Sequence, residues 1–146
     1  MSIEKCYRRA VITIAPQSDL ADAAALMRRE HVGLLVVVDE RRCPVGILTD
    51  RDIVIQTVLN DTSARAVTVG DAMTSKPVVA FAGEPIADVT ERMCCHGVRR
   101  LPVVDNAGAL VGIIASDDVL DYLATQMENL AAITHKEQST ERRVRK

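Results

Sequence analysis

The chain contains the same stretch of sequence twice, 66 residues apart. Shifting the sequence by that distance aligns Met27 with Met93 and Gly46 with Gly112 without a gap. From residue 21 to residue 52 the shift gives 12 identities in 32 positions, against about two expected by chance. An internal duplication of this kind means that each copy is one structural unit, and that the two units pack together to bury a common core.

Each copy shows the same order of predicted elements. A short apolar segment predicts a first strand, and apolar residues at helical spacing follow it. Ser18 is the expected N-cap of this helix in the first copy, and Pro85 suits the first helical position in the second copy. Two further apolar runs predict a hairpin that leads directly into a second helix. The predicted strands are 11–14, 34–38 and 45–48, then 77–81, 101–104 and 110–114, and the second helices are 51–59 and 117 to about 130.

A single unit of about 60 residues covers its apolar sheet face poorly. We therefore predict an α+β fold in which two tandem β-α-β-β-α repeats pack sheet to sheet with pseudo-two-fold symmetry. The predicted division is 1–61 for the first repeat, 62–76 for a connecting segment with one short helix, 77–130 for the second repeat and 131–146 for a charged tail. Because the tail lacks apolar periodicity, we expect it to be disordered.

Composition and charge restrict the class of protein. The net charge of −2 and the pI near 5.9 give no electrostatic reason to expect nucleic acid or an anionic membrane as a partner. No apolar stretch approaches the length of a membrane span, and the N-terminus does not resemble a signal peptide. The four cysteines lack the spacing of a disulfide framework. We expect a cytoplasmic protein with free thiols.

Four segments, in this order and at a fixed offset, resemble the CBS-domain pair, also called a Bateman module. The likeness extends from about Cys6 to Leu130. It implies an adenosine ligand, namely AMP, ADP or ATP, or else S-adenosylmethionine or NAD, bound in clefts between the repeats. It also implies regulation of another, unidentified protein and assembly into homodimers. The segments are Gly46–Asp52, Val69–Thr74, Arg99–Asp105 and Gly112–Asp118.

The first copy carries the complete signature of the family, with Gly46 followed by Thr49 and Asp52. Thr49 lies where a strand gives way to a helix, so its hydroxyl and the nearby unpaired amides suit a phosphate. Asp52 offers two acceptor oxygens to the hydroxyls of a ribose. The resemblance adds Arg99 and Arg100, whose guanidinium groups suit phosphate. It also implies that the adenine rests on Lys76, Pro77, Val78 and Val79.

The second copy departs from this pattern. Ala115 replaces the hydroxyl residue, and Gly33 and Leu34 stand where the other copy has its two arginines. Asp118 alone remains of the signature. We therefore predict one competent site and one degenerate site per chain.

These residues also have plain structural interpretations. Thr49 and Asp52 fit a helix cap, and the two arginines fit a solvated surface pair. The segment 94–96, Cys-Cys-His, lacks the usual spacing of zinc ligands, so we predict no metal site. The sequence has no phosphate-binding glycine loop and no nucleophile elbow. We expect no enzyme and no catalytic cofactor; the alternative to a sensor is a structural or oligomerisation protein with no physiological nucleotide.

The last predicted helix carries apolar residues beyond what the repeat needs, at alternating spacings of three and four. This pattern is typical of a helix that packs against another helix, and it is our reason from the residues themselves to expect a homodimer. The residues of this apolar stripe are Leu120, Leu123, Met127, Leu130 and Thr134.

Overall fold

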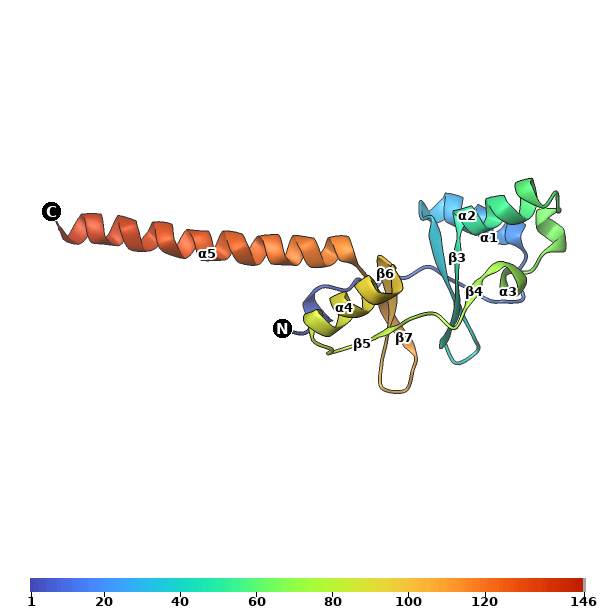
Figure 1. Cartoon of the computed structure of the whole chain (residues 1–146), viewed down its shortest axis with the longest axis horizontal. Helices are drawn as coiled ribbons and strands as arrows, with labels where there is room; N and C mark the ends of the chain where they lie inside the picture. Colours follow the sequence, from blue (N-terminus) through green and yellow to red (C-terminus); the bar gives the residue numbers. More distant parts are fainter. Residues whose placement is uncertain (146) are drawn as a thin grey trace.

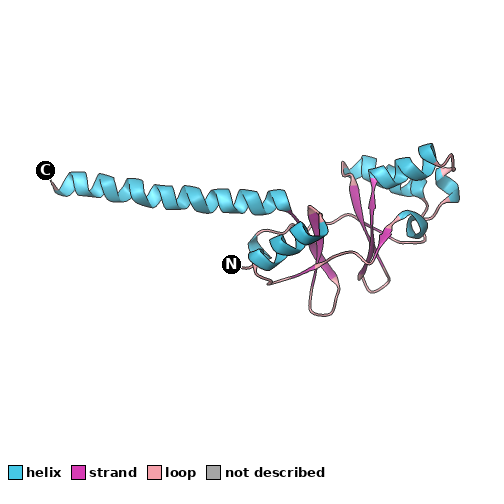
Figure 2. Ribbon diagram, viewed as in Figure 1, coloured by secondary structure: helices cyan, strands magenta, loops and turns pink. Residues whose placement is uncertain are grey.

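The computed structural model describes residues 1–145 and confirms the predicted α+β fold of two β-α-β-β-α repeats. Each repeat forms a small sheet with helices on its outer side, and the two sheets face each other (Figures 1 and 2). The first repeat consists of β1 (Thr13–Ile14), α1 (Leu20–Glu30), β2 (Leu34–Val38), β3 (Pro44–Thr49), α2 (Asp50–Val54) and the π-helical turn η2 (Ile55–Leu59). The second consists of β5 (Ala80–Phe81), α4 (Ile86–His96), β6 (Arg100–Val104), β7 (Leu110–Ala115) and α5 (Ser116–Val144).

The two repeats share the same strand register. In each repeat the first strand is parallel to the second, and the second and third strands form an antiparallel hairpin. Leu35 faces Leu48 across one hairpin, and Leu101 faces Ile114 across the other, 66 residues later. Both hairpins shift register at the same point of the second strand. The duplication seen in the sequence is therefore a duplication of the fold.

The segment that precedes each repeat packs on the other repeat. Ile3, in the short 3-10 helix η1 (Ile3–Lys5), lies in the core of the second repeat and donates its N–H to the carbonyl of Glu84 at 2.9 Å. Val69, in the short helix α3 (Val69–Ala72), lies in the core of the first repeat and donates its N–H to the carbonyl of Ser18 at 2.7 Å. The 3-10 turn η3 (Ala64–Ala66) precedes α3. Strand β4 (Thr74–Ser75) follows α3 and pairs with β3.

The units defined by packing therefore differ from the predicted division of the chain. The beginning of the predicted first repeat, 1–61, supplies core to the second repeat, and the predicted connecting segment, 62–76, supplies core to the first. The predicted short helix in that segment is confirmed as α3, with Thr68 as its N-cap. The crossing could not be predicted because hydrophobic patterns report which residues are buried and not against which neighbour they are buried.

Both helix starts assigned from the sequence are displaced by one residue. Asp19, and not Ser18, caps α1, since its carboxylate accepts the N–H of Asp22 at 2.8 Å. Asp19 also lies 3.1 Å from the guanidinium of Arg65, which ties η3 to α1. Pro85 is the N-cap of α4 and not its first helical residue.

The expectation of a disordered tail is wrong for the residues that the structure describes. Helix α5 continues without a break to Val144 and projects from the body of the molecule (Figure 1). Residues 131–144 contain no glycine or proline and are rich in alanine, lysine, glutamate, glutamine and arginine, which have high helix propensity. The expectation rested on missing packing and overlooked this local preference. In the part of the chain described, no helix is long and apolar enough to cross a membrane.

Candidate functional site between the two repeats

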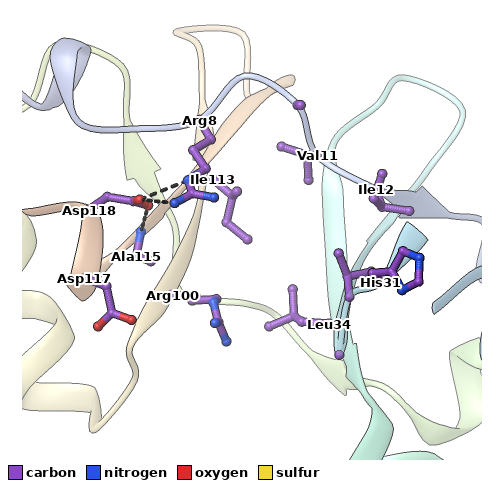
Figure 3. A pocket seen from close by; sticks show the side chains of 13 residues that line it. Arg8, Val11, Ile12, His31, Leu34, Arg100, Ile113, Ala115, Asp117 and Asp118 are labelled. Carbon is purple, nitrogen blue, oxygen red and sulfur yellow. Dashed lines mark hydrogen bonds and ion pairs between the residues drawn. The ribbon is translucent and has the colours of Figure 1, made fainter. Parts of the chain in front are cut away.

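A cavity of about 320 Å³ opens between the two repeats (Figure 3). Three parts of the chain form its wall: the segment before β1, the junction of α1 with β2, and the second repeat around the start of α5. Its size lies within the range of pockets that hold small molecules. The lining residues are Arg8, Ala10, Val11, Ile12, His31, Val32, Gly33, Leu34, Arg100, Ile113, Ala115, Asp117 and Asp118.

Asp118 is the most sheltered charged group of this cavity, with 11% of its side chain exposed. Its Oδ2 accepts the backbone N–H of Ala115 at 3.2 Å, because Asp118 lies in the first turn of α5. Its Oδ1 accepts the Nε–H of Arg8 at 2.9 Å, and Nη2 of the same guanidinium lies 2.9 Å away (Figure 3). Both carboxylate oxygens are therefore occupied.

Arg8 is held in place by its backbone. Its N–H donates to the carbonyl of Ile113 at 2.9 Å, and its carbonyl accepts the N–H of Ile113 at 2.9 Å. The same pairing joins Thr74 to Ile47 in the other repeat, 66 residues away in each case. Sequence reasoning missed Arg8, because its partner Asp118 is 110 positions distant and Arg8 belongs to no motif. The one available signal was the 66-residue offset, which aligns residues 10–12 with the predicted ligand contacts at residues 76–78 and so indicated that the segment after Arg8 lines a cleft.

The cavity and the predicted site are related by the internal symmetry. Shifting seven of the thirteen lining residues by 66 positions, forward for the first repeat and backward for the second, gives residues of the predicted site. The pairs are Ala10 with Lys76, Val11 with Pro77, Ile12 with Val78, Gly33 with Arg99, Leu34 with Arg100, Ala115 with Thr49 and Asp118 with Asp52. The cavity therefore lies at Ala115 and Asp118, the site expected to be degenerate, and the site expected to be competent is its symmetry counterpart.

Thr49 and Asp52 form a reciprocal cap at the start of α2. Oδ2 of Asp52 accepts both the N–H and the Oγ1–H of Thr49 at 2.9 Å, and the hydroxyl oxygen of Thr49 accepts the N–H of Asp52 at 3.3 Å. The structural interpretation of these two residues is therefore correct. It leaves room for a second role, since Oδ1 of Asp52 accepts no hydrogen bond from residues 1–145.

Arg100 lies at the cavity of Asp118. Its side chain lines the cavity beside Asp118 and lies between Asp117 and Leu34 (Figure 3). Within the described chain, no hydrogen bond or ion pair joins it, or the exposed Arg99, to Thr49 or Asp52. The structure thus brings Arg100, Ala115 and Asp118 together at the cavity. Thr49 and Asp52 bond to each other and, within residues 1–145, not to either arginine.

The segment predicted to hold the adenine is bound by Arg92, which also forms an ion pair with Glu84. Lys76 is exposed with a positive φ of 52°, and the following Pro77, Val78 and Val79 are half-buried. Arg92 donates one Nη1–H to the carbonyl of Val79 at 2.9 Å and contacts Glu84 through Nη2 at 2.6 Å. The hydrogen bond from this guanidinium holds the pKa of Glu84 below its usual range.

The two signature glycines make room for the chain itself. A Cβ on Gly112 would lie 2.6 Å from the carbonyl oxygen of Arg8 and would overlap the ring of Tyr7. A Cβ on Gly46 would overlap the side chain of Met73. The close approach at both glycines is therefore that of the segment that crosses from the other repeat.

The Cys-Cys-His segment ends helix α4. Cys94 and Cys95 are exposed, and Nδ1 of His96 lies 2.9 Å from the carbonyl oxygen of Arg92. Across residues 1–145, no three histidine, cysteine, aspartate or glutamate side chains gather in a way that would hold a metal ion.

Comparison with known proteins identifies the family. The model of the CBS domain matches residues 3–56 and 69–125. The CBS domain-containing protein YhcV of Bacillus subtilis is 33% identical over 131 residues, which are 90% of this chain and 89% of YhcV. The CBS domain pair of protein MJ0100, solved with 5'-methylthioadenosine and S-adenosyl-L-methionine, superimposes with a TM-score of 0.73 at 25% identity, covering 86% of this chain and 98% of that one. CBSX2, solved with AMP, superimposes with a TM-score of 0.69 at 28% identity, covering 86% of this chain and 95% of that one. The chain therefore belongs to the CBS domain family and contains two CBS domains in tandem.

Proposed function

We propose that this protein is a sensor that binds an adenine nucleotide between its two CBS domains and thereby alters a surface read by another protein. The observation that carries the proposal is the cavity between the repeats at Asp118. Asp52, which the 66-residue offset places opposite Asp118, keeps one carboxylate oxygen unpaired among residues 1–145. The ligands named for MJ0100 and CBSX2 support an adenosine compound. AMP, ADP and ATP fit the proposal best, because we assign Arg99 and Arg100 to the phosphate.

At the predicted site around Thr49 and Asp52, called the first cleft below, we assign a role to each group. Oδ1 of Asp52 accepts the ribose hydroxyls, and the amides at the start of α2 face the phosphate beside Thr49. Arg100, and Arg99 before it, supply positive charge. The adenine lies on the segment 76–79, which Arg92 and Glu84 hold in place. Each of these groups is assigned a role in holding a ligand, so we propose regulation rather than catalysis.

Calorimetric titration of AMP, ATP and adenosine tests the assignment. Asp52→Ala should weaken binding ten- to a hundredfold, because buried ribose hydroxyls lose a charged acceptor worth about 1–3 kcal/mol. Asp118→Ala, the matched change in the other repeat, should change the affinity of the first cleft little. Arg100→Ala should weaken AMP more than adenosine. Equal losses for the two aspartate variants, or two equivalent sites per chain, would overturn the one-site assignment.

A second candidate function is oligomerisation without a physiological nucleotide. The exposed apolar stripe of α5 favours a second copy of the chain as a partner, whichever function the cleft has. Mass spectrometry of ligand retained by the purified protein, and thermal unfolding with and without AMP, separate the two candidates. A ligand that binds only the folded state must raise the unfolding midpoint, so an unchanged midpoint at millimolar AMP would favour the oligomerisation protein.

A further inference from the structure

We propose that Arg8 competes with ligands for Asp118, so that the second cleft accepts a nucleoside only when the Arg8 guanidinium leaves the carboxylate. This inference rests on the proposed function and deepens it, because it concerns the regulation of the cavity at Asp118, called the second cleft. On this proposal, a side chain of the protein itself occupies the carboxylate that a ribose would need in this cleft.

The two signature carboxylates have different side-chain partners. Oδ2 of Asp52 also accepts the hydroxyl of Thr49, which has no counterpart at Ala115. Both accept a backbone N–H at the start of a helix through Oδ2, from Thr49 in one repeat and from Ala115 in the other. Oδ1 of Asp52 accepts no hydrogen bond within residues 1–145. Oδ1 of Asp118 accepts from Arg8. A ribose that approached Asp118 as it approaches Asp52 would need the oxygen that Arg8 occupies.

The contact is built so that the cation can leave and the anion stays. The Arg8 side chain is 73% exposed, whereas that of Asp118 is 11% exposed. An exposed guanidinium regains its hydration when it swings away, which offsets part of the ion-pair energy that is lost. The N–H of Ala115 keeps the carboxylate in position after Arg8 has gone. The acceptor for a ribose is therefore already in place.

The backbone of Arg8 keeps the competitor at the cavity. Its two hydrogen bonds with Ile113 fix the main chain, so only the side chain has to move. No arginine stands at positions 33 and 34, the counterparts of Arg99 and Arg100, and Arg100 itself lines this cavity. Replacing the internal ion pair with a ligand is thus a local exchange at one oxygen atom, which links occupancy of the second cleft to the segment that crosses between the repeats.

Adenosine is the probe that tests the proposal, because it carries ribose but no charge. In a ¹⁵N-labelled sample, the amides of Ile113 and Ala115 report on the second cleft and those of Thr49 and Asp52 on the first, so each cleft gives its own dissociation constant. Arg8→Ala should tighten adenosine at the second cleft roughly three- to tenfold and leave the first cleft unchanged. Arg9→Ala is the matched control, since Arg9 lies over the Tyr7 ring and does not line the cavity.

A measurement on the unmodified chain gives an independent test. Salt screens exposed ion pairs, so raising the ionic strength should strengthen adenosine binding at the second cleft of the wild type and have no such effect in Arg8→Ala. Arg8→Lys, which keeps the charge but loses the Nε–H, should lie between the wild type and Arg8→Ala. Unchanged or weaker adenosine binding at the second cleft of Arg8→Ala, with normal binding at the first, would overturn the competition alone. Absence of adenosine and AMP binding at both clefts of every variant would overturn the proposed function and the competition with it.

Discussion

The glycines at positions 46 and 112 occupy equivalent places in the two repeats but face different atoms. A methyl group on Gly112 would meet the backbone carbonyl of Arg8, which two hydrogen bonds hold in place. A methyl group on Gly46 would mainly meet the side chain of Met73, which is flexible and can turn aside. Gly112→Ala should therefore destabilise the fold by about 1–3 kcal/mol, and Gly46→Ala should cost less. Urea denaturation of the two variants compares them, and an equal loss would contradict this account.

The ion pair of Glu84 with Arg92 makes stability depend on pH in a defined direction. Because the guanidinium lowers the pKa of Glu84 in the folded chain, its contribution is complete above the unfolded pKa of about 4.3 and is lost as the pH falls through the lower folded value. Glu84→Gln should cost about 1 kcal/mol at pH 7. The difference between wild type and variant should shrink at pH 3. Urea midpoints at the two pH values give the result, and a constant difference would refute the assignment.

Single residues were predictable from the sequence where their partners are close along the chain. Thr49 and Asp52 are three positions apart, and this spacing indicated a helix cap, whereas the binding site was implied by the resemblance to the CBS-domain pair. Arg8 escaped notice because nothing in a local pattern connects it with Asp118. The assignment of the predicted ligand contacts at residues 76–79 stays a prediction.

Among the secondary-structure elements, α5 has the least support from the rest of the chain. Val119 is buried against the second repeat, but the leucines and the methionine of the apolar stripe are 38–71% exposed. A helix that lacks tertiary packing is only marginally stable in water, and a second copy of the same stripe would cover these residues. We therefore expect a dimer formed through α5.

Charge placed in the stripe should separate this dimer. Met127→Glu should convert the dimer to a monomer at micromolar concentration, because a desolvated carboxylate has no partner there. Ala132→Glu, on the opposite side of the same helix, is the control and should remain dimeric. Light scattering reads both, and a wild-type monomer would defeat the expectation outright.

Hydrophobic periodicity predicted the hairpins and the first helix of each repeat because these elements bury one face. The same reasoning failed for residues 131–144, where no face is buried and intrinsic propensity decides the structure. The start of α1 was displaced by one residue because Ser18 and Asp19 are both good caps. Tertiary contacts fix this segment, among them the ion pair of Asp19 with Arg65 and the hydrogen bond from Val69 to Ser18.

For the molecule as a whole, the crossing segments make the stability of each repeat depend on a segment that precedes the other repeat. Ile3 is fully buried in the core of the second repeat. Ile3→Ala should destabilise the protein by about 2–5 kcal/mol. The amides of β6 and β7 should lose protection from hydrogen exchange before those of β2 and β3. Val69→Ala, the counterpart, should reverse that order, and loss of protection in the same repeat for both variants would argue against the crossing.

The duplication made the pairing of two units predictable, whereas the exchange of segments between them was not. A sequence repeat states that two pieces are alike, and either piece could have kept its own leading segment. The contacts of Ile3 and Val69 with opposite cores decide the matter.

This exchange bears on how such a chain arises. A lone ancestral unit with the same contacts would leave its own core open, and a second copy would supply the missing segment while receiving one in return. That is a domain-swapped dimer. If two such genes are fused end to end, the exchange of segments takes place within a single chain, and the assembly no longer depends on protein concentration. If the chain is cut between residues 61 and 64, each fragment should fold poorly alone, and the two fragments should fold together when they are mixed.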